Sequence, residues 1–84
     1  MLDLIKDALK ARVALAERHV REGEQHVMCQ LARVQALAAK GYETADAEQT
    51  LRQFRRAHVI CIADRDRLKL ELAASDAADS DNVI

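Results

Sequence analysis

The residues best able to do chemistry are histidines and cysteines that recur at helical spacing in two segments of the chain. His26 and Cys29 are three residues apart, and so are His58 and Cys61. Helical side chains three or four residues apart share one face, so each pair can present two ligands to the other segment. Two imidazoles and two thiolates form a tetrahedral zinc ligand set. His26, Cys29, His58 and Cys61 are therefore the candidate metal ligands, with zinc as the candidate cofactor.

The alternative is that these side chains are structural and that the chain binds no cofactor. On a helical wheel, Cys29 points roughly 100° or more away from the valines that mark the apolar face. His26 then becomes a polar residue at the edge of that face, and Cys61 a small buried apolar residue. The same offset argues against a disulfide between Cys29 and Cys61 within one chain, because bridged Cα atoms lie within about 7 Å of each other.

Other chemistry finds less support in the residues. Arg52, Arg55 and Arg56 form a basic patch, but no aromatic residue accompanies it for stacking on bases, and Glu48 lies one turn away. We favour a solvated, salt-bridged helix face over a nucleic-acid site. The sequence has no glycine-rich phosphate loop and no serine or threonine with a matched base. We therefore expect no enzymatic activity and no small-molecule substrate.

A valine repeat predicts the first element that must position these residues. Val13, Val20, Val27 and Val34 recur every seven residues, which places them along one side of a helix. A second row runs three residues after each valine, with one member before it: Leu9, Ala16, Gly23, Gln30 and Leu37. The two rows predict a helix over about residues 3–40 that packs on a partner helix.

Gly41 marks the end of this helix, since glycine accepts the left-handed conformation just past a helix end. Tyr42 then falls where it folds back on Leu37 in a Schellman ending. Thr44 suits the N-cap of a second helix over about residues 45–73. So short a connection predicts an antiparallel helical hairpin over 1–74, in which a turn centred near residues 42–43 places His26 opposite residue 59.

The second helix carries its own apolar stripe at alternating steps of four and three: Ala47, Leu51, Phe54, His58, Cys61, Arg65, Leu68 and Leu72. Residues 75–84 are small, polar and acidic, and they predict a disordered tail. Gly23 costs about 1 kcal/mol in mid-helix relative to alanine. This cost is offset either by close approach of the helices or by a notch that receives a large partner side chain.

The composition argues for self-association. The 84 residues include no proline or tryptophan, one phenylalanine and one tyrosine, so a single hairpin has few bulky groups for its own core. We expect the all-α hairpin to dimerise into a four-helix bundle. The contact residues predicted within and between hairpins are Leu9, Val13, Ala16, Val20, Gly23, Val27, Leu31, Val34, Leu37, Leu51, Phe54, Cys61 and Leu68.

The formal net charge of −1 gives no basic field for nucleic acid. No apolar run reaches the roughly 18 residues that a membrane span needs, and no signal peptide is recognisable at the start of the sequence. The expected location is the cytoplasm, where Cys29 and Cys61 stay reduced.

Several motifs resemble a group of small, uncharacterised bacterial helical-hairpin proteins. The resemblance covers about residues 12–70 and rests on residues 18–27, Gln30, residues 41–48, Leu51, Phe54 and residues 64–68. It implies a hairpin fold and no known activity. In that group a large aliphatic residue is common at the position of His58, histidine at Cys61 and arginine at Cys29, so the resemblance implies no family metal site.

The sequence as a whole predicts a non-catalytic helical interaction module that self-associates and binds a protein partner, with regulation as one role for that binding. The alternative function is a metal- or redox-responsive protein that uses His26, Cys29, His58 and Cys61. A nucleic-acid adaptor that uses the Arg52–Arg56 patch ranks third.

Overall fold

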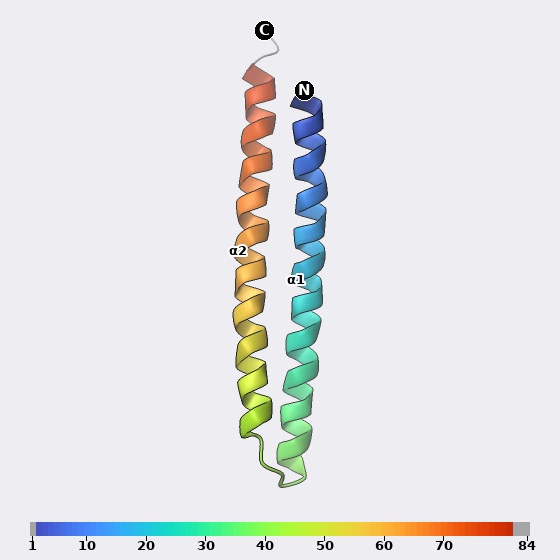
Figure 1. Cartoon of the computed structure of the whole chain (residues 1–84), viewed down its shortest axis with the longest axis vertical. Coiled ribbons are helices and arrows are strands. Elements are labelled where there is room, and N and C mark those ends of the chain that lie inside the picture. The colour runs from blue at the N-terminus through green and yellow to red at the C-terminus, as the bar shows by residue number, and fades with distance from the viewer. Residues whose placement is uncertain (1, 82–84) are drawn as a thin grey trace.

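The protein is a long hairpin of two helices. The computed structural model describes residues 2–81, with α1 over Leu2–Ala39 and α2 over Ala45–Asp81. The helices run antiparallel and side by side for almost their whole length, so the start of α1 and the end of α2 lie at one end of the molecule (Figure 1). The hairpin measures 68 × 14 × 14 Å. This confirms the predicted all-helical fold.

A Schellman motif ends α1, as the glycine signal predicted. Gly41 has a φ of 75°, and its N–H donates to the carbonyl of Ala38 at 3.0 Å. The N–H of Tyr42 donates to the carbonyl of Leu37, also at 3.0 Å. These two bonds define the motif and satisfy carbonyls that the helix itself leaves open.

The connection sets a different pairing of the helices from the one predicted. The Schellman turn brings Tyr42 back toward Leu37, so residues 42–44 return beside the last turn of α1 before α2 begins (Figure 1). His58 consequently lies opposite Gly23, whereas a turn centred at 42–43 predicted it opposite residue 27. The predicted register was wrong by about one helical turn.

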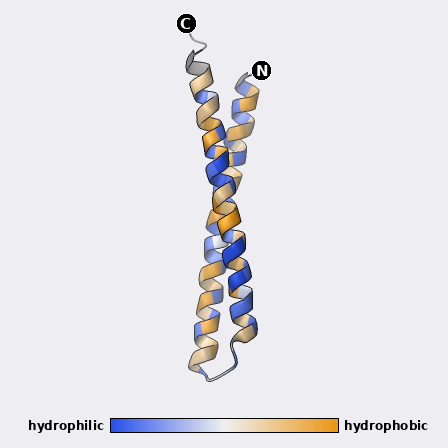
Figure 2. Cartoon of the chain, turned by 90° about the vertical axis from the view of Figure 1, so that its left-hand side faces the viewer, coloured by the Kyte–Doolittle hydropathy of each residue, from blue (hydrophilic) through white to orange (hydrophobic). Residues whose placement is uncertain are grey.

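A row of small and aliphatic side chains forms the contact between the helices. Five of the described residues are buried: Val13, Ala16, Val20, Leu51 and Leu68. The other predicted contact residues are half-buried: Leu9, Gly23, Val27, Leu31, Val34, Leu37, Phe54 and Cys61. No large side chain of the described residues is completely buried. The two helices cross near mid-length when the hairpin is seen from the side (Figure 2), as expected for helices that follow a seven-residue repeat.

The second helix is longer than predicted. It continues to Asp81, about two turns past the predicted end near residue 73, so the predicted disorder was wrong for residues 75–81. Residues 82–84 of the predicted tail lie outside the described residues. Alanine is the strongest helix former and favours this extension at Ala73, Ala74, Ala77 and Ala78. An ion pair of 2.8 Å between Lys6 Nζ and Asp76 Oδ1 also ties the extension to α1.

Neither α1 nor α2, as far as the structure describes them, has an apolar stretch long enough to cross a membrane.

Asp76 makes the end of α2 sensitive to acid. A hydrogen bond from Lys6 holds the pKa of Asp76 below its ordinary value, and attraction to Lys6 and Lys10 acts in the same direction. A carboxyl with a lowered folded pKa stabilises the fold above its unfolded pKa, and this contribution is lost as the pH falls through the folded pKa. We expect amide protection in residues 74–81 to be present at neutral pH and to fall in strong acid.

Asp76→Asn is expected to lower the same amide protection at neutral pH and to remove most of its acid dependence, measured by hydrogen exchange with NMR. Asp66→Asn is the control, because Asp66 pairs only with Arg65 on its own helix at 3.0 Å. Equal protection in the wild type and Asp76→Asn at neutral pH would show that the Lys6 contact does not hold the end of α2.

Candidate functional site

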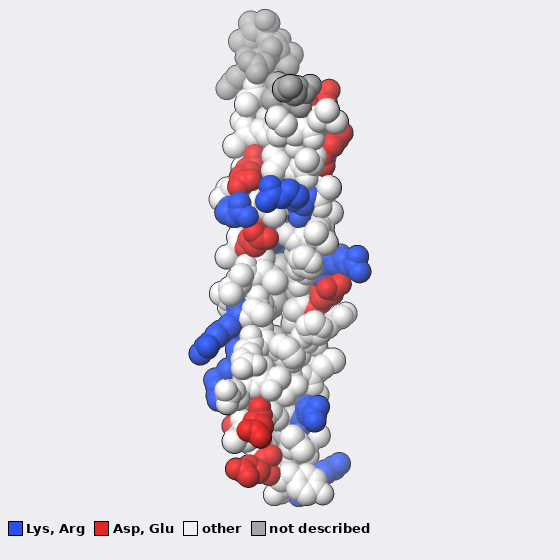
Figure 3. Space-filling model, viewed as in Figure 1, with Lys and Arg blue, Asp and Glu red and all other residues white. Residues whose placement is uncertain are grey.

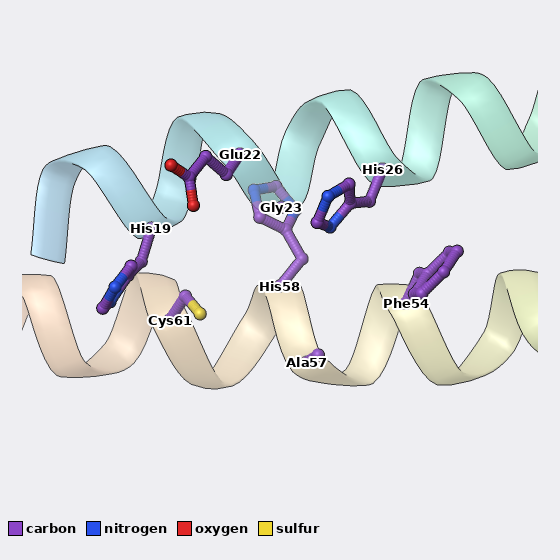
Figure 4. A pocket seen from close by; sticks show the side chains of 8 residues that line it. All are labelled: His19, Glu22, Gly23, His26, Phe54, Ala57, His58 and Cys61. Carbon is purple, nitrogen blue, oxygen red and sulfur yellow. The ribbon is translucent and has the colours of Figure 1, made fainter.

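A hollow of about 190 Å³ lies between the helices near mid-length. All three histidines of the chain line it, together with one of its two cysteines. The complete lining, shown in Figure 4, is His19, Glu22, Gly23, His26, Phe54, Ala57, His58 and Cys61. The hollow therefore gathers most of the residues that the sequence singled out for chemistry.

His58 projects from α2 into a notch left by Gly23 in α1 (Figure 4). A Cβ atom added to Gly23 would lie 3.1 Å from Cδ2 and 3.7 Å from Cα of His58. The first distance is tighter than ordinary van der Waals contact, and the second shows that the α1 and α2 backbones approach closely. The close helix approach expected to offset a mid-helix glycine is present, and the side chain in the notch comes from the same hairpin rather than from a partner.

The His58 ring is incompletely hydrogen-bonded. Its Nε2 atom is the one buried side-chain nitrogen or oxygen that has no hydrogen-bond partner among residues 3–78, whose side chains the structure describes. A buried polar atom left without a partner costs about 1–3 kcal/mol. His58 thus fills the notch at a cost that a purely apolar side chain of similar size would avoid.

The predicted metal ligands are only partly brought together. His26, His58 and Cys61 line the hollow, whereas Cys29 is exposed and lies outside it. The His26 ring packs on Phe54, with ring centroids 5.6 Å apart. Among the side chains that the structure describes, those of residues 3–78, no group of three or more histidine, cysteine or acidic residues is placed to hold a metal ion. Zinc binding stays a prediction, with Cys29 displaced from the set.

Two further hollows flank the first, and the three follow one another along the hairpin. A hollow of about 110 Å³ is lined by Arg12, Leu15, Ala16, His19, Asp64 and Leu68. Another, of about 290 Å³, is lined by Gln30, Arg33, Leu37, Glu43, Asp46, Ala47 and Thr50. His19 lines both the hollow of about 190 Å³ and the hollow of about 110 Å³. The three hollows make one side of the hairpin, here called the open flank.

Residue size explains the open flank. On α1 it is bordered at seven-residue spacing by long or ring-bearing side chains: Arg12, His19, His26 and Arg33. On α2 it is bordered at the same spacing by short ones: Thr50, Ala57 and Asp64. Side chains this short cannot cover the gap between the helices. Sequence reasoning missed this flank, although the short residues at seven-residue spacing were a signal that could have revealed it.

The opposite flank is better closed. Lys69 Nζ lies 3.8 Å from Glu17 Oε1 and links α2 to α1 on that side. Leu31 and Ile62 occupy equivalent positions on the two helices there and are half-buried. The two sides of the hairpin therefore differ in how fully side chains close the gap between the helices.

Charges on the open flank differ between its two borders. Arg12 and Arg33 are the formally charged residues of the α1 row. On α2, Arg67 donates hydrogen bonds of 2.7 Å to Asp64 and 2.7 Å to Glu71, and the bond to Asp64 is the main cause that raises the pKa of Arg67. On this border one arginine is paired with two carboxylates, so the α2 border has a net negative charge.

On the face seen in Figure 3, the strip between the two helices carries no Lys, Arg, Asp or Glu at mid-height, and the charged side chains there lie along the outer edges. The basic patch predicted from the sequence lies elsewhere on α2, where Arg55 and Arg56 border exposed Val59 and Ile60.

Exchanging the sizes of the two residues at the notch tests this contact. Gly23→Leu is expected to lower the free energy of unfolding by about 2 kcal/mol or more, because the larger side chain meets the His58 ring. His58→Ala should relieve much of that loss in the double variant, with a coupling energy of at least about 1 kcal/mol in a double-mutant cycle measured by urea unfolding.

Gln25→Leu is the matched control, since Gln25 is exposed on the same helix and should show no coupling to His58→Ala. Additive losses for Gly23→Leu and His58→Ala would show that the two residues do not contact each other in solution.

Comparisons of the chain with protein-family models, with curated proteins and with solved structures find no match in any of the three. The resemblance of its motifs to small bacterial helical-hairpin proteins stays a prediction.

Proposed function

We propose that the protein is a non-catalytic helical interaction module that associates with a second copy to form a four-helix bundle. The observation that carries the proposal is an open flank beside a thin core. Only the contact between α1 and α2 buries apolar side chains, and a hairpin of this size gains little stability from so small a core.

Exposed apolar groups support the same proposal. Among the residues whose side chains are described, eight large apolar ones are at least half exposed: Leu4, Ile5, Leu15, Met28, Tyr42, Val59, Ile60 and Leu70. Single exposed apolar residues are normal on protein surfaces, but Leu15 lines the open flank itself, where a partner would cover it together with the hollows. The proposed setting is the cytoplasm, with Cys29 and Cys61 as free thiols. A further protein partner would bind the assembled bundle.

Self-association is tested by analytical ultracentrifugation of the purified chain over a wide range of concentrations. We expect the mass of two chains, and a melting temperature that rises with protein concentration because the dimer is the more stable folded state. A mass of one chain and a melting temperature independent of concentration would overturn the proposal.

Metal binding is the second candidate function, favoured by one observation. The three histidines and Cys61 line a single hollow, and His58 Nε2 has no hydrogen-bond partner. Imidazole nitrogen and thiolate sulfur are ligands that zinc accepts, and the exposed His19 and His26 side chains supply two further imidazoles to the lining of the hollow.

Zinc titration by calorimetry tests this candidate. The wild type is expected to bind zinc and to gain a higher melting temperature, and His58→Leu is expected to lose both effects while keeping the hairpin, because leucine fits an apolar helix contact. No heat of binding and no change in melting temperature of the wild type would overturn it.

A further inference from the structure

We infer that the second copy docks on the open flank in a parallel arrangement, with α1 of each chain against α2 of the other and both connections at the same end. This inference rests on the proposed self-association and names its surface and geometry. A two-fold axis along the length of the bundle produces this arrangement, in which the same surface of both copies meets.

The open flank is large enough for a stable interface. The hairpin is 68 Å long and 14 Å wide, so one flank presents on the order of 900 Å², compared with roughly 800 Å² per partner in standard protein interfaces. The flank also holds three hollows in a row, which gives the partner a groove rather than a smooth surface.

The shapes of the two borders are complementary. The α1 border carries long or ring-bearing side chains every seven residues, and the α2 border carries Thr50, Ala57 and Asp64 at the same spacing. In the parallel arrangement, the row of large side chains on one copy lies against the row of small ones on the other. Helices pack in this way when the ridges of one fill the grooves of its neighbour.

The charges favour the same arrangement. Because His58 lies opposite Gly23, Arg12 is level with residue 69 and Arg33 with residue 48. Across the parallel dimer, Arg12 therefore lies near the partner's Glu71, and Arg33 lies near the partner's Asp46. The antiparallel arrangement would set α1 against α1, so that the arginine and histidine rows of the two copies faced each other. Charge complementarity of this kind selects orientation more strongly than it adds affinity.

A cross-link distinguishes the arrangements. Cys29 and Gln53 are both exposed, and the register places them nearly level on the outer edges of the open flank. Within one chain these edges point apart, whereas in the parallel dimer Cys29 faces the partner's Gln53. The variant Gln53→Cys with Cys61→Ser should therefore form a covalent dimer on oxidation, because Cα atoms within about 7 Å can be bridged.

The matched control is Arg52→Cys with Cys61→Ser. Arg52 is exposed and nearly level with Cys29, but its place in the seven-residue repeat turns it toward the opposite flank, so it should give no covalent dimer. Cys61→Ser alone reports any link between two Cys29 residues and should also give none. The readout is the fraction of covalent dimer on a non-reducing gel.

Charge exchange provides a second measurement. Arg33→Glu and Asp46→Arg each place like charges in both inter-chain contacts of their own dimer, whereas a mixed dimer of the two variants restores opposite charges in both. We expect the mixed dimer to be favoured by about tenfold over either dimer of one variant, which corresponds to about 1.4 kcal/mol. Arg55→Glu, an exposed position toward the opposite flank, should show no such preference.

The outcomes separate the two proposals. A single-chain mass at every concentration overturns self-association and the inference with it. A second outcome is a mass of two chains with either no cross-link between Cys29 and Gln53→Cys or no preference for the mixed dimer. That outcome overturns the parallel arrangement on the open flank and leaves self-association standing. Cross-linking together with mixed-dimer preference supports the inference.

Discussion

The insertion of His58 at Gly23 is the contact on which the arrangement of the hairpin depends. The Cβ position of Gly23 lies 3.1 Å from the His58 ring, so no larger residue fits there unless the ring moves. Sliding one helix along the other would leave the ring against a full-sized side chain and would empty the notch. One steric fit near mid-length therefore fixes the level of every other pair of residues across the helices.

The two ends of the hairpin agree with the register that this contact sets. Near the connection, the Gln30 side chain donates a hydrogen bond of 2.9 Å to the carbonyl of Ala47. At the far end, Lys6 meets Asp76 at 2.8 Å. A hydrogen bond to a backbone carbonyl and a surface ion pair are each modest in energy. They select among registers that the apolar row alone leaves nearly equal, because a seven-residue repeat matches itself again after each heptad.

The sequence was sufficient for the fold and insufficient for the register. Gly41 and the valine repeat predicted the end of α1 and the face it buries, since both depend on local conformation and periodicity. The level of His58 depended on the path of three connecting residues, and a small difference in that path moves a whole helix by one turn. The sequence does not predict the extension past Ala73, because small, polar and acidic residues indicate disorder, whereas alanine content and the Lys6 contact favour helix.

The candidate site, like the fold, could be predicted from the sequence only in part. Residue types and spacing identified His26, His58 and Cys61, and the structure places all three around one hollow. They did not identify the open flank, because its form depends on how short residues such as Ala57 line up across from long ones on the other helix. That alignment depends on how the two helices pair, and the seven-residue spacing of the short residues on α2 is its signal in the sequence.

The fit of His58 into Gly23 also has an evolutionary consequence. Neither residue can change freely, since a larger residue at position 23 collides with the ring and a smaller one at position 58 leaves a void. Related chains that keep this hairpin should vary the two positions together and conserve their combined volume. That pair would then record the register in an alignment, in the middle of two helices whose exposed faces are free to diverge.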